Sequence, residues 1–154
     1  MSNLPDNVLD YLASSKTVTL ATASEDGTPH ASTFMYVNDG SDLYVWARTS
    51  STTAGHLQHN SKVSFAIDEY VEDWNKAKGI QGDGQGAPVN GEGIAIAVRL
   101  FGDKFPTTSS GASTTNIAFF KISATHLVFI DNEGEKTEFG GDEFGMDFHR
   151  EEVL

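Results

Sequence analysis

Short runs in which apolar and polar residues alternate recur along the chain, and such alternation is typical of a β-strand with one buried face. In the run 62–70, for example, Val63, Phe65 and Ile67 would share one face of a strand. The same kind of pattern predicts strands over the residue ranges 16–23, 30–37, 43–48, 117–122 and 126–131. The sequence therefore favours a fold made mostly of β-strands.

Turn signals join the first three of these strands. Asp26-Gly27 separates 16–23 from 30–37, and the segment "NDGSD" separates 30–37 from 43–48. Short turns join antiparallel strands, whereas parallel strands need a crossover of roughly a dozen residues or more. The pattern thus predicts an antiparallel meander at the start of a small, mostly antiparallel barrel.

The segment "GIQGDGQGAPV", residues 79–89, is unusual because glycine recurs through it. Glycine weakens a strand, but it also marks bulges and places where a backbone or a ligand approaches closely. We expect a bent or bulged strand here.

Three other segments have the pattern of a helix. In 5–14, Val8 and Leu12 would lie on one face. The segment "TAGHLQHN" has room for about two helical turns. A third helix is predicted within 90–106, where Asn90 could cap the first turn.

The rest of the chain carries weaker signals. The segment "TTSSGASTTN", 107–116, reads as a flexible loop, and the glycine-rich, acidic tail from about 132 to 154 has no predicted structure. No internal repeat divides the chain, so residues 1–154 are expected to form one domain.

The chain is strongly acidic, with a formal net charge of −12. Nucleic acids and anionic membrane surfaces repel such a chain, which argues against both as partners. No apolar run approaches the roughly 18 residues of a membrane helix, and the start "MSNLPDNVLDYL" lacks the features of a signal peptide. There is no cysteine for a disulfide or a thiolate metal site. We therefore expect a soluble cytoplasmic protein.

Five hydroxyl side chains in a row, Thr49 to Thr53, follow Arg48 and precede the short central helix. The N-terminus of a helix carries unpaired N–H groups and a partial positive charge, so this turn could hold a phosphate with help from Arg48. An ordinary Ser/Thr helix cap within a polar loop explains the same residues. The segment alone leaves both interpretations open.

The histidines are weaker evidence for a binding site than the hydroxyl run. His56 and His59 stand three residues apart and could form a metal pair, but no carboxylate or third histidine completes a ligand pattern. Surface positions explain them as well. Trp46 and Trp74 could stack on a flat ring, although packing is the usual role of tryptophan.

Taken together, residues 5–131 resemble the pyridoxamine 5′-phosphate oxidase-like, FMN-binding split-barrel family. The segment "TVTLATASEDGTPHASTFMYV" is similar to the family's first two strands and their turn. "DLYVWARTSSTTAGHLQHNSKVSFAI" is similar to its third strand, phosphate loop, helix and fourth strand, and "GIQGDGQGAPV" to its fifth strand. Each motif is degenerate, and the order and spacing of all of them carry the resemblance.

The resemblance implies a six-stranded antiparallel split β-barrel of the Greek-key, FMN-binding type, mostly β with helices. It also implies a homodimer with FMN at the subunit interfaces. By position, the residues that would bind the cofactor are Thr33, Phe34, Met35, Trp46, Ala47, Arg48, Thr49, Ser51, Thr53 and Gln81. Among these, Arg48, Thr49, Ser51 and Thr53 would hold the phosphate, and Gln81 would reach the ring across the dimer.

One position departs from the family's pattern. The phosphate loop usually reads Ser-x-Lys, and here it reads Ser51-Thr52-Thr53. A lysine lost beside a phosphate would weaken binding unless Arg48 and helix N–H groups compensate. The C-terminal substrate signature of the true pyridoxamine phosphate oxidases is not recognisable, so vitamin B6 oxidation is not expected.

The resemblance implies an FMN-dependent oxidoreductase acting on a small-molecule substrate that the sequence does not identify, with no catalytic residue assigned. The deazaflavin F420 or haem could take the place of FMN. A haem-binding or haem-degrading relative and a non-enzymatic cofactor-binding dimer are the alternatives.

Overall fold

The computed structural model describes residues 4–106, 114–133 and 150–154. The helical elements are α1 (Asp6–Ser14), α2 (Thr52–His59) and α3 (Glu92–Lys104), with short 3-10 turns η1 (Trp74–Lys76) and η2 (Thr114–Asn116). The strands are β1 (Thr17–Ala23), β2 (Pro29–Met35), β3 (Val37–Asp39), β4 (Asp42–Arg48), β5 (Lys62–Asp68), β6 (Lys78–Pro88), β7 (Ile117–Asp131) and β8 (Arg150–Glu152).

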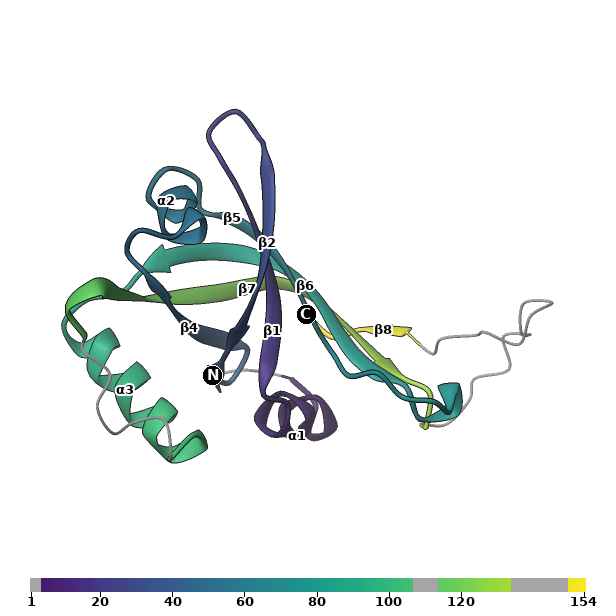
Figure 1. Cartoon of the computed structure of the whole chain (residues 1–154). Coiled ribbons are helices and arrows are strands. Elements are labelled where there is room, and N and C mark those ends of the chain that lie inside the picture. The colour runs from purple at the N-terminus through teal and green to yellow at the C-terminus, as the bar shows by residue number, and fades with distance from the viewer. Residues whose placement is uncertain (1–3, 107–113, 134–149) are drawn as a thin grey trace.

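All pairings between these strands are antiparallel, and they form one strongly curved sheet (Figure 1). The order across it is β2-β1-β5-β6-β7-β4-β3, with the short β8 added beside β7. The six longer strands are those of a split barrel, so the predicted fold class is confirmed. Figure 1 shows β6 and β7 continuing as a long ribbon away from α2.

The sheet is brought round on itself by one kinked segment. The predicted strand 30–37 was wrong as a single strand, because it breaks at Tyr36 into β2, at one edge, and β3, at the other. Tyr36 is fully buried, its backbone N–H donates to the Lys16 carbonyl at 3.2 Å, and its hydroxyl donates to the Leu12 carbonyl at 2.6 Å. These bonds hold the bend against α1 and the start of β1.

The two predicted strands 117–122 and 126–131 were also wrong as separate elements, because β7 is continuous. The segment between them stays in the sheet through a bulge. Asp83 pairs with His126 while Gly84 pairs with Ala124, so Thr125 is the extra residue, and its hydroxyl donates to the Asp83 carbonyl at 3.2 Å. The bulge keeps both halves of β7 paired with the bent strand β6.

The glycines of β6 have a packing reason. Gly82 and Gly86 face the core, where a Cβ on Gly82 would meet Phe65 and Leu127, and one on Gly86 would meet Leu57 at 2.8 Å. Large neighbours fill the space that the missing side chains leave. The predicted strand over 79–89 is confirmed as β6, but the extra residue of the bulge lies on its neighbour β7.

The core lies inside the curved sheet and under α1 and α2. Its buried residues include Val8 and Leu12 of α1, Leu57 of α2 and the inward residues Leu20 and Ile122 of the sheet. A smaller cluster around Ala97 joins α3 to β3 and β4. None of the described helices has the length and hydrophobicity that a membrane crossing would require.

The predicted cap of the third helix was wrong. Helix α3 begins at Glu92, after Gly91, whose φ of +51° turns the chain just before the first helical residue. The carbonyl of Asn90, and not its side chain, accepts a hydrogen bond from the Gly93 N–H at 3.0 Å. Of the predicted flexible loop, residues 107–113 lie outside the described residues, as do 134–149 of the tail.

Candidate functional site

A pocket of about 260 Å³ lies in the split of the barrel, where β2 faces β4 next to the start of α2. The strands β2 and β4 are not neighbours in the sheet order, and the pocket lies where they approach each other. The residues lining it are His30, Ser32, Thr33, Phe34, Met35, Trp46, Ala47, Arg48, Ser51 and Thr53.

Most of the residues implied by the family resemblance meet in this pocket. Thr33, Phe34 and Met35 come from β2, and the other five lining residues named in advance are Trp46, Ala47, Arg48, Ser51 and Thr53. Thr49 and Gln81 do not line it. That these residues bind a cofactor stays a prediction.

Two lining residues, His30 and Ser32, were not expected from the sequence. They lie on β2 four and two residues before Phe34, respectively, and all three side chains are half-buried while their neighbours Ala31 and Thr33 are exposed. Alternation along a strand puts every second side chain on one face. Once Phe34 was placed in the pocket, the same period would have pointed to Ser32 and His30.

The two ends of the pocket carry different kinds of side chain. The strands β2 and β4 run in opposite directions, so the start of β2 faces the end of β4. β2 continues into β3, which pairs antiparallel with β4, so His30 lies toward Arg48 and α2, while Met35 lies toward Trp46. The first end carries charged and polar groups. The second end is formed by apolar side chains.

The hydroxyl run at the polar end has divided roles. The Ser51 hydroxyl caps α2 by accepting from the Ala54 N–H at 3.1 Å, so the helix-cap interpretation is confirmed for this residue. Thr49 turns away, since its N–H donates to the Asn116 carbonyl at 2.9 Å. Thr53 lines the pocket, is only 1% exposed, and has no side-chain hydrogen bond within the described part of the chain.

The polar end also offers hydrogen-bond donors to a ligand. The N–H of the lining residue Thr53 belongs to the first turn of α2, where N–H groups have no intrahelical acceptor, and the Thr52 N–H lies in the same turn. Arg48 is exposed, and no carboxylate of residues 4–106, 114–133 or 150–154 forms an ion pair with it. This arrangement favours an anion, because amides at a helix N-terminus and a guanidinium both bind phosphate oxygens.

The apolar end is suited to a flat ring. Phe34 and Met35 lie on β2, and Ala47 and Trp46 lie across the split on β4. Trp46 is 38% exposed, so part of its indole remains at the surface beside the pocket. Trp74, the other tryptophan, is on η1, does not line the pocket, and its carbonyl accepts from the Asn132 side chain at 2.8 Å.

A histidine pair stands behind the polar end. The rings of His30 and His56 lie edge to face with centroids 6.1 Å apart, and His56 Nδ1 is 2.9 Å from the hydroxyl of the buried Thr22. His59 points elsewhere, with Nδ1 3.7 Å from Glu25. Within the described residues no group of three or more histidine, aspartate or glutamate side chains could hold a metal ion.

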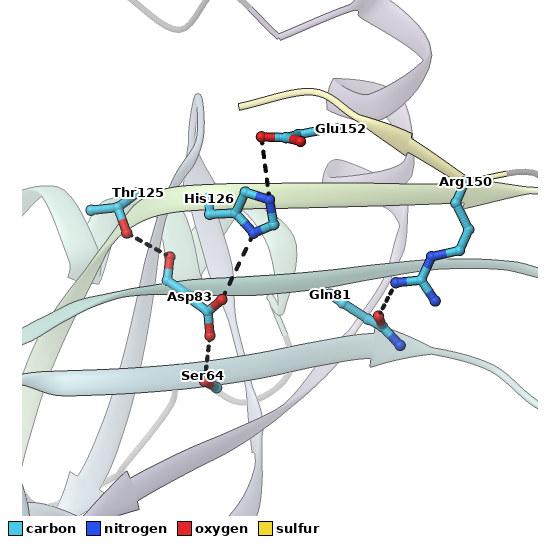
Figure 2. A network of polar contacts seen from close by, with 7 residues as sticks. All are labelled: Ser64, Gln81, Asp83, Thr125, His126, Arg150 and Glu152. Carbon is cyan, nitrogen blue, oxygen red and sulfur yellow. Dashed lines mark hydrogen bonds and ion pairs between the residues drawn. The ribbon is translucent and has the colours of Figure 1, made fainter.

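A second polar cluster lies on the outer face of β5, β6, β7 and β8 (Figure 2). His126 stands between two carboxylates, with Nδ1 3.7 Å from Asp83 and Nε2 3.4 Å from Glu152. Gln81 belongs to this cluster, because its side-chain carbonyl accepts from Arg150 at 2.7 Å. These contacts attach β8 to the sheet and occupy Gln81 on a face away from the pocket's lining residues.

A half-buried lysine lies at the kink of the barrel. Lys104 Nζ is 4.1 Å from the centre of the Tyr36 ring and donates to the Leu12 carbonyl at 3.4 Å. Burial, together with a smaller effect of the positive charge of Lys16, lowers the pKa of Lys104 to about 8. Burial also raises the pKa of Tyr36, whose hydroxyl shares the same carbonyl acceptor.

Comparison with known proteins adds to this geometry. The model of the protein family described as "Pyridoxamine 5'-phosphate oxidase" matches residues 4–131. No curated protein matches the chain.

Solved structures share the fold at low identity. HutZ, a haem storage protein from Vibrio cholerae, is 20% identical with a TM-score of 0.71, over 82% of this chain and 94% of that one. A conserved hypothetical protein from Mycobacterium tuberculosis is 20% identical with a TM-score of 0.71, over 92% and 93%. An FAD-binding protein from Mesorhizobium loti is 18% identical with a TM-score of 0.62, over 79% and 89%. At these identities the likeness extends to the fold alone.

Proposed function

Because the chain belongs to the pyridoxamine 5′-phosphate oxidase family, we propose that its pocket between β2 and β4 binds FMN and that the protein is a flavin-dependent oxidoreductase. The observation that carries the proposal is the pocket itself. It joins an anion-binding end, at Arg48 and the start of α2, to an apolar end at Phe34, Met35 and Trp46. FMN has the same two parts, a phosphate and a flat ring.

The polar end fits a phosphate in several ways. The amides of Thr52 and Thr53 point out of the first helical turn, and the guanidinium of Arg48 has no carboxylate partner among the described residues. The Thr53 hydroxyl lines the pocket at this end and could donate to a phosphate oxygen.

The apolar end fits a flavin ring. Trp46, Phe34 and Met35 would contact its faces and edges, and Ala47 is small enough to leave room beside the β4 backbone. When bound, the flavin supplies the redox chemistry, and the protein binds and orients it and limits access of water. The partly exposed Trp46 leaves one side of this end open to a small-molecule substrate.

The size of the pocket supports a homodimer. Sites for ligands of this kind typically enclose about 300–1,000 Å³. One chain provides about 260 Å³, so it covers only part of a flavin. A second copy would complete the wall, and an exposed residue such as Gln81 of the partner copy could then reach the ring.

The visible spectrum of the purified protein, alone and with added FMN, tests the proposal. We expect FMN binding at tens of micromolar or tighter, and Arg48→Ala should weaken it about tenfold or more, as for loss of a charged hydrogen bond. Arg99→Ala is the matched control, since Arg99 is exposed on α3 and does not line the pocket. An unchanged FMN affinity in Arg48→Ala would show that the phosphate lies elsewhere.

Haem is the second candidate ligand. The observation that favours it is His30, the histidine in the pocket lining, since histidine is a common axial ligand of haem iron. HutZ, whose fold this chain shares, is described as a haem storage protein. A Soret band on haem addition that is lost in His30→Ala would support this candidate over FMN, and a featureless titration would exclude it.

A further inference from the structure

We infer that His30 is the second cationic side chain of the pocket's anion-binding end and contacts the terminal phosphate of the ligand. The inference rests on the proposed function, because it assigns a partner to the phosphate of a bound phosphomonoester. It concerns a residue that the family-derived site does not include.

The positive charge at the polar end is smaller than the negative charge of a phosphomonoester. A phosphomonoester carries about −1.5 to −2 charges near neutral pH. Arg48 supplies one positive charge, and a helix N-terminus is equivalent to roughly half a charge. The whole chain carries −12, so the remaining phosphate charge would face a negative protein. Thr53, at the position next to these groups, offers a hydroxyl and no charge.

His30 lies at the polar end of the pocket, where a phosphate would bind. It lines the pocket on β2, opposite the end of β4 that carries Arg48, and its ring is 6.1 Å from that of His56 on α2. It is half-buried, so a proton on its ring would interact with a bound anion through less water than on an open surface. No described carboxylate forms an ion pair with it.

The surrounding groups allow one positive charge here. On the elements packed against His30, the titratable and charged groups are His56 and His59 of α2, Asp42, Tyr44 and Arg48 of β4, and Glu25 and Asp26 of the β1–β2 turn. Asp42 begins β4, at the end away from Arg48, and pairs with Lys121 at 2.8 Å. Glu25 is already 3.7 Å from His59, and Asp26 accepts hydrogen bonds from Ser24 and Thr28. His56 Nδ1 is 2.9 Å from the Thr22 hydroxyl, and of the two histidines only His30 lines the pocket.

Phosphate binding should therefore depend on protonation of an imidazole, which changes charge between about pH 5 and 8. The test compares the dissociation constants of FMN and of riboflavin, which lacks the phosphate, by fluorescence titration at pH 6 and pH 8. Wild type, His30→Gln and His30→Lys are used. His59→Gln is the matched control, because His59 lies on α2 outside the pocket lining.

We expect His30→Gln to weaken FMN binding about tenfold at pH 6 and to leave riboflavin binding within about twofold. The affinity ratio of wild type to His30→Gln should be smaller at pH 8. This ratio is the decisive quantity, because titration of the phosphate itself cancels in it. His30→Lys should restore FMN binding at both pH values, and His59→Gln should change neither ligand's affinity.

Equal losses for FMN and riboflavin, or a ratio that does not change with pH, would overturn the inference while the FMN proposal stands. If wild type bound neither flavin, the proposed function would fail instead. The inference would then be judged with inorganic phosphate: an NMR shift of the His30 ring on phosphate addition, lost in Arg48→Ala, would support it, and no shift would refute it.

Discussion

The glycine at position 82 tests the packing argument for β6 directly. Gly82 lies opposite Phe65 of β5 and Leu127 of β7 in the sheet register. A Cβ added there would be 2.7 Å from Leu127 Cδ2 and closer still to the Phe65 ring. Both neighbours are buried, at 1% and 5% exposure, so neither side chain can move into solvent. The variant Gly82→Ala must therefore displace core atoms.

The expected cost follows from two opposing effects. Overpacking a core by a methyl group costs about 1–3 kcal/mol, and replacing glycine by alanine gains about 0.4–1 kcal/mol from the unfolded chain. Gly82→Ala should therefore lower the free energy of unfolding by about 1–2 kcal/mol. Gly102→Ala is the control, because Gly102 lies in α3 with nothing within 4 Å of its added Cβ. It should stabilise by about 0.8–1 kcal/mol.

Urea unfolding followed by tryptophan fluorescence measures both variants. The two free energies of unfolding should differ by about 2–3 kcal/mol, which corresponds to roughly 1 M urea between the midpoints. A midpoint for Gly82→Ala equal to or above that of wild type would refute the close packing described for β6. Equal slopes in the two variants are needed for the comparison, because a changed slope would indicate a changed unfolded state.

Three further predictions concern other parts of the molecule. Ser51→Ala removes the cap of α2 and should lower the free energy of unfolding by about 1 kcal/mol in thermal melts, whereas Ser50→Ala, at an exposed residue that caps no helix, should change it little. Lys104 should titrate near pH 8 in NMR spectra of labelled lysine, below the ordinary pKa of 10.5. Between pH 8 and 10.5 the native state therefore binds fewer protons than the unfolded state, and the contribution of Lys104 to the free energy of unfolding rises with pH. A midpoint near 10.5 would contradict the burial of its amine. His126→Ala should speed hydrogen exchange of the Val153 amide by up to about fivefold, because exposed ion pairs contribute about 0.2–1 kcal/mol, and unchanged exchange would mean that the outer cluster does not hold β8.

Local signals predicted much of the fold. The Asp26-Gly27 turn specified the β1–β2 hairpin, and Gly27 has the positive φ, +88°, that such a turn requires. The hydrophobic pattern located the strands because each buries one face. The order of the strands across the sheet has no local signature, and the family resemblance implied only a Greek-key split barrel.

The errors arose where distant contacts override a local pattern. The segment 30–37 contains no turn signal at Tyr36, yet a hydrogen bond to Leu12, 24 residues away, fixes a bend there. Likewise, "SATH" within 117–131 looks like a break, but Thr125 bonds to Asp83 and the strand continues as a bulge. In both cases the deciding partner is remote in sequence.

The sequence predicted where the candidate site lies, but it did not predict all of the residues that line it. The sequence directed attention to Arg48 and the hydroxyl run, and of these Arg48, Ser51 and Thr53 line the pocket, whereas Thr49 bonds to Asn116. His30 was missed because histidine is common at surfaces and the facing strand β4 is not its neighbour in the sheet. Its place became evident only once the split of the barrel brought β2 and β4 together.

The strand order also determines when the barrel can form as the polypeptide is made. β4 needs β7 as its neighbour, and the pair Arg48↔Ile117 is separated by 117 − 48 = 69 residues. Contacts of such long range raise the contact order and slow folding. A ribosome-bound nascent chain ending before β7 therefore leaves one edge of β4 unpaired, and the curved sheet becomes complete only after the last long strand has been made.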